Sequence, residues 1–332
     1  MVNETSSEGG LIEQAIFTSA QTERGGGYQV VASSPGVVDD DLRALAVWCP
    51  SHDAMLDERC SATSVNFHPL PSGAFAVSRT ATAGAEYSQR GGHRLHTHCL
   101  ITPADTLRRF SNSPFALLRA AVAGGLLQTT QPVPRQLPAV RLPGRAGAVD
   151  RALVSRLGQE LGRDGLKRLL HVALTAKSLG LAFPRAETIL AGILNCLPIE
   201  VRTEFSFATG LRFSPRRLFR WTAVGKDRAA QRHLEQQFGV IVVSPADDRR
   251  WLTAVSCHDW AEFVAMCVAR GRLSALQAEL GRTRPDLTPA DLPALGTACQ
   301  RRLSDRAAPG RAGGTAGVAK TDQTLTPLVG HG

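Results

Sequence analysis

The sequence lacks the patterns that most directly identify a function. No run of apolar residues approaches the ~18 to 20 that a membrane-spanning helix requires. There is no G-x-x-x-x-G-K-[ST] loop and no G-x-S-x-G elbow. The chain is therefore not itself a P-loop NTPase, and no hydrolase motif places a nucleophile. We expect no membrane span and no cofactor.

The cysteines form no recognisable framework. They are odd in number and are never spaced as C-x-x-C, which favours reduced, buried thiols over disulfides. The first ten residues, MVNETSSEGG, lack the basic and then apolar stretch of a secretory signal. We therefore expect a cytoplasmic protein. The seven cysteines are Cys49, Cys60, Cys99, Cys196, Cys257, Cys267 and Cys299.

Lysine is scarce. Only four of the 38 basic residues are lysine, so nearly all of the net charge of +9 comes from arginine. A positive balance can indicate nucleic-acid binding. The arginines are dispersed rather than arranged in a stripe, however, and arginine in place of lysine beside abundant alanine and glycine is what a GC-rich genome produces. We do not expect a nucleic-acid partner, although a basic nucleic-acid-binding protein stays an alternative.

Apolar and charged residues are present in ordinary amounts, 43% and 20%. With 332 residues, these fractions fit a soluble globular protein large enough for two domains. We predict an α+β protein of two mixed domains, each a small, largely antiparallel sheet packed with helices. The predicted boundaries are a disordered leader at 1–10, an N-terminal domain at 11–127, a Pro-rich linker at 128–148, a second α/β domain at 149–305 and a disordered tail at 306–332.

Local patterns place the elements of the first domain. Alternating apolar residues and turn residues predict strands at 11–20, 27–33, 65–69, 74–80 and 93–102. Three aspartates at the positive end of a helical pattern predict a helix at 39–48. A helix is also expected from 103, and Ser113 with Pro114 opens a further one. Four prolines between 131 and 147 then predict an extended, exposed linker.

The densest core pattern of the chain lies between 185 and 224. Apolar residues at helical spacing predict a helix that Pro198 ends. Alternating segments at 203–211 and 218–223 predict two strands that form a hairpin around the basic turn FSPRR. Elsewhere we expect helices near 149, at 166–176 and 227–238, and from 259 and 288. Strands are expected at 180–183 and, fully buried, at 239–244.

Histidines on the predicted strand at 93–102 are candidates for a metal site. His96 and His98 project to one face of a strand, which a metal could use. Cys99 follows, and Cys49 with His52 could add a pair. No second cluster has clean ligand spacing, so a half-exposed histidine face competes with this interpretation. We predict no metal and no catalytic residue and keep His96 and His98 as metal candidates. A metal-dependent or Cys/His hydrolase stays an alternative.

Arginines gather around the predicted hairpin. Guanidinium groups bind phosphates and carboxylates through paired hydrogen bonds. A solvated turn in an arginine-rich protein would look the same, so the cluster does not define a ligand by itself. An acidic protein surface is the favoured partner over a nucleotide. The cluster consists of Arg202, Arg212, Arg216, Arg217 and Arg220.

Two blocks of the sequence resemble known proteins. IEQAIFTSA…GYQVVASSPGV followed by FAVSRTATAGAEYSQRGGHRLHTHCLI resembles the N-terminal domain of bacterial GTPase-associated proteins. ILNCLPIEVRTEFSFATGL is similar to the middle domain of the same proteins. The matching residues are Gln14, Tyr28, Ser33, Pro35, Gly36, Ser78, Arg79, Tyr87, Arg90, Gly91 and His98 in the first block and Leu197, Pro198, Arg202, Phe205, Ser206, Phe207 and Thr209 in the second.

The resemblance implies a component of a multi-gene system built around a GTPase, with a role in bacterial conflict or stress responses. It brings no catalytic residues. We therefore predict a non-enzymatic adaptor or regulatory subunit whose partner is a protein, namely a GTPase encoded nearby. The predicted contact residues are Arg79, Arg90 and His98 in the first domain and Arg216, Arg217 and Arg220 in the second.

Overall fold

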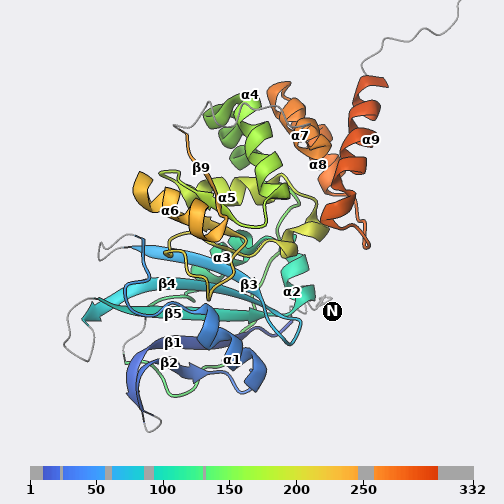
Figure 1. The fold of residues 1–332 in the computed structure, drawn as a ribbon. Coiled ribbons are helices and arrows are strands. Elements are labelled where there is room, and N and C mark those ends of the chain that lie inside the picture. Colours follow the sequence, from blue (N-terminus) through green and yellow to red (C-terminus); the bar gives the residue numbers. More distant parts are fainter. Residues whose placement is uncertain are drawn as a thin grey trace, which may run out of the picture.

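A nine-stranded sheet runs through the molecule. The computed structural model describes residues 10–22, 25–56, 62–85, 93–129, 132–245 and 258–305. Within them the strand order is β2-β1-β5-β4-β3-β7-β8-β6-β9. The long strands lie at one end of the molecule and a group of helices lies at the other (Figure 1). The predicted α+β class is confirmed. The predicted leader, apart from Gly10, and the tail lie outside the described residues.

The first five strands form the antiparallel part of the sheet. Their alternating sequences place one set of side chains on each face, as predicted. Both predicted hairpins are confirmed, since β1 pairs with β2 and β3 pairs with β4. The strands are β1 (Glu13–Thr22), β2 (Gly25–Ser33), β3 (Thr63–Pro69), β4 (Phe75–Ala85) and β5 (His93–Thr102).

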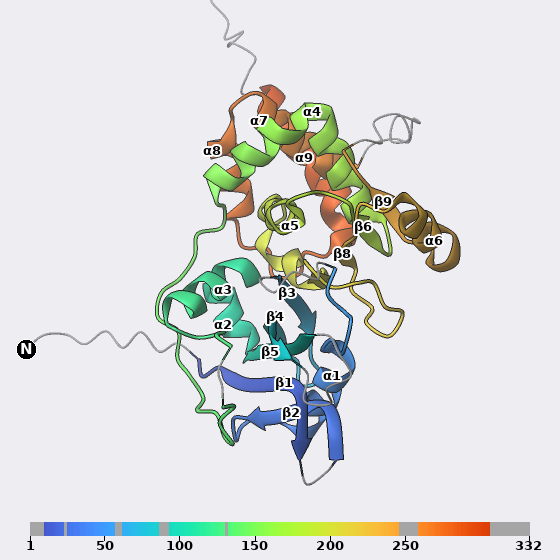
Figure 2. The ribbon, with the colours of Figure 1, turned by 90° about the vertical axis from the view of Figure 1, so that its left-hand side faces the viewer.

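Helices cover both faces of this antiparallel part (Figure 2). On one face, Val77 and Leu100 share a core with Leu117 of α3 (Pro114–Ala123). On the other, Ala76 and Cys99 pack with Leu45 of α1 (Asp39–Trp48). The short α2 (Ala104–Arg109) leads into α3, whose first turn is capped as predicted, because the Ser113 hydroxyl accepts a hydrogen bond from the Ala116 amide.

The second half of the sheet differs from the prediction. Its strands are β6 (Leu179–Leu181), β7 (Phe207–Ala208), β8 (Trp221–Ala223) and β9 (Ile241–Val243). β6 pairs in parallel with β8 and β9, and β7 pairs in parallel with β8. The predicted antiparallel hairpin at 203–223 is therefore wrong. The strand predicted at 239–244 is present as β9, but it is not fully buried, since Ile241 is 48% exposed.

The hairpin does not form because few residues between 199 and 223 have an extended backbone. Residues Ile199–Glu204 form a 3₁₀ helix, η1, in place of the start of the predicted strand. The aromatic alternation that suggested two long strands instead fills one buried cluster, in which the rings of Phe205 and Trp221 stack at 4.4 Å. The loop between β7 and β8 carries the chain back so that both strands run the same way.

The two halves of the chain join within the sheet. β3 pairs antiparallel with β7, with Phe67 opposite Phe207. The ring of Phe207 also stacks on Phe115 of α3 at 4.8 Å. The prediction of two separate small sheets is therefore corrected. The cause is non-local, because strands 140 residues apart pair only when the whole core assembles.

Replacing Gly210 with alanine should weaken this junction. A Cβ at Gly210 would lie 2.6 Å from the Thr63 carbonyl oxygen, on backbone that cannot move aside easily. We expect the free energy of unfolding to fall by about 1 to 3 kcal/mol, the usual cost of overpacking. Gly225→Ala is the matched control, since nothing lies within 4 Å of its added Cβ. Urea unfolding of both variants measures the difference, and equal stability of the two would refute the close contact.

Some helices of the second half pack against the parallel strands, and the others pack on one another. α4 changes direction at Gly162, where φ is 66°. α8 was not predicted. None of the described helices is long and apolar enough to cross a membrane. The helices are α4 (Arg151–Thr175), α5 (Ala186–Asn195), α6 (Arg228–Phe238), α7 (Asp259–Ala269), α8 (Leu273–Leu280) and α9 (Leu292–Asp305), with a 3₁₀ turn η2 (Pro289–Asp291) before α9.

The Pro-rich segment packs against the first half of the sheet. Val140 and Ile12 exchange backbone hydrogen bonds of 2.9 and 2.8 Å. The Pro138 carbonyl accepts hydrogen bonds from the Gln14 side chain at 2.7 Å and the Ser34 hydroxyl at 3.2 Å. Leu142 is buried in the main core. The segment is thus a strap along β1, because its leucines and carbonyls find partners there.

Arg202 fastens three segments together. Its buried guanidinium donates hydrogen bonds to the carbonyl oxygens of Leu197 (3.0 Å), Ser111 (2.9 Å) and Ala148 (2.5 Å). These oxygens belong to the turn after α5, the turn between α2 and α3, and the end of the Pro-rich segment. The guanidinium therefore joins the two halves of the chain.

Candidate functional site

Arg79 and His98 lie opposite each other on neighbouring strands, β4 and β5. His98 is buried, and its Nε2 lies 2.9 Å from the side-chain oxygen of Gln14. Since the Gln14 amide nitrogen donates to Pro138, the oxygen of Gln14 is the acceptor and His98 carries its proton on Nε2. The half-buried Arg79 donates to the Leu127 carbonyl at 3.3 Å. Both side chains are engaged inside the fold.

Burial keeps both strand histidines neutral. It lowers the pKa of His98 to about 4, and the neighbouring His96 lowers it further. The pKa of His96 also falls to about 4, through burial and then the charge of Arg94. Arg90, the third contact residue predicted for this half, lies outside the described residues.

The histidines do not meet the other ligands that a metal ion needs. In the described part of the chain, no group of three or more His, Cys, Asp or Glu side chains is placed to hold a metal. His96 and His98 share a face of β5, as the strand pattern predicted. That face is covered by core side chains rather than open to solvent.

Several cysteines are held as thiols. Burial raises the pKa of Cys196 to about 12, of Cys267 to about 12 and of Cys299 to about 11. A thiol is a poor nucleophile compared with a thiolate, so these side chains are not activated for catalysis. Cys60 and Cys257 lie outside the described residues.

The predicted basic turn forms a loop between β7 and β8. We call residues 212–218 (RFSPRRL) the basic loop. Arg216 is exposed at its tip, whereas Arg217 is half-buried and donates to the Arg212 carbonyl at 3.1 Å. Arg220, just after the loop, donates to the Leu174 carbonyl at 2.9 Å, and its guanidinium lies 4.3 Å from the centre of the Phe205 ring. The three predicted contact arginines therefore do not point to one surface.

The basic loop also carries apolar side chains to the surface. Leu218 is 74% exposed, the most exposed large apolar side chain in the described part of the chain. The ring of Phe213 lies 5.1 Å from that of Phe238, which is 43% exposed at the end of α6. The loop and the last turn of α6 thus form one continuous surface, beside each other in Figure 2.

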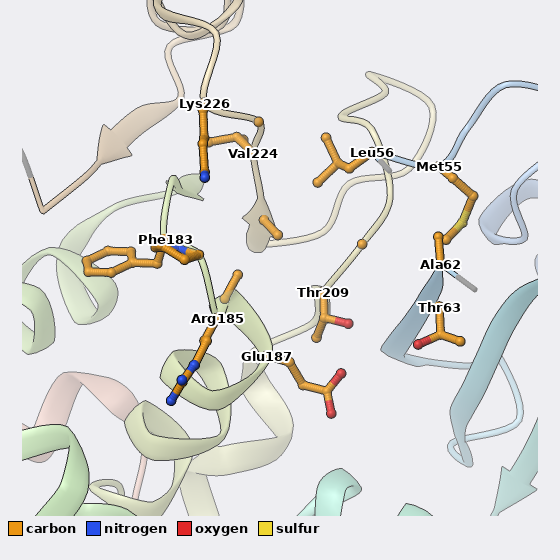
Figure 3. A pocket seen from close by; sticks show the side chains of 15 residues that line it. Met55, Leu56, Ala62, Thr63, Phe183, Arg185, Glu187, Thr209, Val224 and Lys226 are labelled. Atoms are coloured by element: carbon orange, nitrogen blue, oxygen red, sulfur yellow. The ribbon is translucent and has the colours of Figure 1, made fainter. Parts of the chain in front are cut away.

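A cleft lies at the carboxyl ends of β6, β7 and β8 (Figure 3). In α/β sheets this edge is a frequent place for ligands. The cleft has a volume of about 780 Å³, and Arg185, Glu187 and Lys226 are among the residues that line it. One wall comes from Met55, Leu56, Ala62 and Thr63 of the first half of the chain, and the opposite wall from the second half.

Sequence reasoning missed the cleft and the contact between the basic loop and α6. The cleft and this contact both depend on the parallel pairing of strands, which no local sequence pattern predicts. The amphipathic character of α6 was a signal for the second, because Phe238 follows Leu234 and Gln231 on one helical face. Arg202 was assigned to the basic cluster, although its place three residues before the aromatic run that starts at Phe205 points to an internal role.

The family match covers the first part of the chain. Residues 11–143 match the family model of GTPase-associated protein 1, N-terminal domain type 2. No curated protein matches the chain. The matched region extends past the predicted domain end at 127 and includes the strap formed by the Pro-rich segment. The resemblance of residues 193–211 to a middle domain stays a prediction. The sequence resemblance of the first block is confirmed by this match over residues 11–143.

Proposed function

We propose that the protein is a non-enzymatic adaptor or regulatory subunit of a GTPase-centred complex of a bacterial conflict or stress system. The observation that carries this proposal is the family match over residues 11–143. The name of the family links its members to GTPases and assigns them no reaction.

The positions of the family-matching residues support a structural role for them. The hydroxyl of Tyr28 accepts a hydrogen bond from the Leu95 amide at 3.0 Å. Ser78 accepts one from the buried Asn66 amide at 3.2 Å. Gln14, Arg79 and His98 are likewise engaged within the domain, as described above. Because these side chains stabilise the fold, the contact with a partner falls to other residues, which lie on the surface.

Co-expression with the GTPase encoded nearest to its gene tests the proposal. We expect the two proteins to co-elute in size-exclusion chromatography, with a mass by light scattering that includes both. An adaptor would leave the GTP hydrolysis rate of the partner unchanged, and a regulatory subunit would shift it. An unrelated GTPase of similar size is the control. Separate elution in the presence of GDP and of a non-hydrolysable GTP analogue would refute the proposal.

A further inference from the structure

We infer that the basic loop, with the last turn of α6, is the docking surface for the partner, and that the partner presents an acidic face with an apolar pocket for Leu218. This inference rests on the proposed function and adds to it the site of contact and the chemistry of the other side.

Leu218 is the apolar anchor of the surface. At 74% exposure it keeps most of its isobutyl group in water, at the end of a loop that contacts the rest of the fold through other residues. At protein interfaces, a few residues that are buried in well-packed pockets contribute most of the binding free energy. The exposed edge of Phe238 extends the apolar area from the loop onto α6.

The loop is held in one conformation before a partner arrives. Ser214 and Arg217 form an antiparallel bridge across the turn, with a hydrogen bond of 3.0 Å from the Arg217 amide to the Ser214 carbonyl. Phe219 is buried, and its ring contacts Trp48 at 4.9 Å. Phe213 is held against Phe238. Preorganised contacts of this kind reduce the entropy lost on binding.

The basic loop itself carries charge of one sign, while the last turn of α6 carries one carboxylate, that of Glu235. No acidic residue occurs between Glu204 and Asp227, a segment that includes four arginines and Lys226. Arg212 and Arg216 are exposed on the loop itself. Carboxylates on a partner would complement these cations, speed association and weaken as salt is added.

A protein fits this surface better than a nucleic acid does. Leu218 is aliphatic and has no ring to stack on a base, and Phe213 and Phe238 are already packed against each other. Arginine is enriched and lysine is depleted at protein interfaces, which fits the arginines of the loop.

Two variants test the surface, each with a matched control. In the co-expressed complex with the neighbouring GTPase, Leu218→Asp and the double variant Arg212→Glu, Arg216→Glu should each raise the dissociation constant about tenfold or more, as expected of anchor residues. Val47→Asp is the control for the first, since Val47 is 56% exposed on α1. Arg301→Glu, exposed on α9, is the control for the second. Circular dichroism and thermal unfolding verify that each variant is folded.

The outcomes separate this inference from the proposed function. Wild-type binding that the loop variants lose and the control variants keep supports the surface. Wild-type binding that all four variants keep overturns the surface and leaves the proposed function standing. No binding by the wild type overturns both. Salt-sensitive binding of a duplex or single-stranded oligonucleotide that Arg212→Glu, Arg216→Glu abolishes would replace the acidic protein face with a phosphate backbone and so overturn the inferred partner chemistry.

Discussion

Replacing Arg202 with methionine should lower the free energy of unfolding by about 3 kcal/mol. The guanidinium donates three hydrogen bonds to backbone carbonyls, and bonds from a charged donor contribute about 2 kcal/mol each. Burial opposes this gain: it lowers the pKa of Arg202 to about 10. That shift corresponds to a cost of about 3 kcal/mol for the charged form. The hydrogen bonds contribute more free energy than the burial of the charge costs. Methionine fills part of the space but makes none of these bonds, so three buried carbonyl oxygens are left without donors.

Urea unfolding and the melting temperature measure this effect. For a protein of this size, about 3 kcal/mol corresponds to a decrease of roughly 4 °C in the melting temperature. Arg202→Lys should destabilise nearly as much, because a single ammonium cannot reach three divergent carbonyls. Arg216→Met is the matched control on an exposed arginine and should change the free energy by no more than about 0.5 kcal/mol. If Arg202→Met and the control variant have the same free energy of unfolding, the hydrogen bonds of Arg202 do not stabilise the contact between the two halves of the chain.

Local sequence patterns predicted the elements whose ends are set by nearby residues. α1 spans the predicted 39–48, β5 spans the predicted 93–102, and α3 begins at Pro114 with Ser113 as its cap. α1 is fixed by the aspartates at its start and α3 by its cap, and β5 ends where Pro103 leads into the next helix. These signals act within one helix or strand, so the position of that element does not depend on how the rest of the chain packs.

Contacts between distant parts of the chain determine the features that local sequence patterns did not predict. The alternation around Phe205 and Trp221 was real, but it marked a buried cluster rather than a hairpin. The direction of β8 relative to β7 depends on a loop whose path is set by Phe219 and Phe213, each packed on a different element. The same packing turns Arg217 and Arg220 inward and leaves Arg216 outside. Predicting which arginine of a cluster is exposed therefore required the tertiary fold.

Acid should destabilise the protein before its carboxylates are fully protonated. His68, His96 and His98 are buried, and burial is the main cause that lowers the pKa of each to about 4. In the unfolded chain their pKa is close to 6.5. Between these two values the unfolded state binds protons that the folded state excludes, so the free energy of unfolding falls as the pH is lowered from about 6.5 to 4. Above pH 6.5 both states are neutral and these three side chains give no pH dependence.

The size of the effect follows from the width of this window. Each histidine contributes about 1.4 kcal/mol per pH unit, so the three together should remove about 6 kcal/mol between pH 6.5 and 5 at most. His68→Phe isolates one contribution, because a phenyl ring can keep the stacking on Trp48 at 4.5 Å without titrating. We expect this variant to lose about a third of the slope that these three histidines give to stability against pH, measured by urea unfolding at half-unit steps. Burial also lowers the pKa of His171 and of His258, which add to the slope equally in both proteins. His233→Phe, on the exposed side of α6, should keep the slope. If the free energy of unfolding does not change from pH 7 to 5, these histidines reach water in the folded protein. The conclusion that the histidine face of β5 is buried and uncharged would then be wrong.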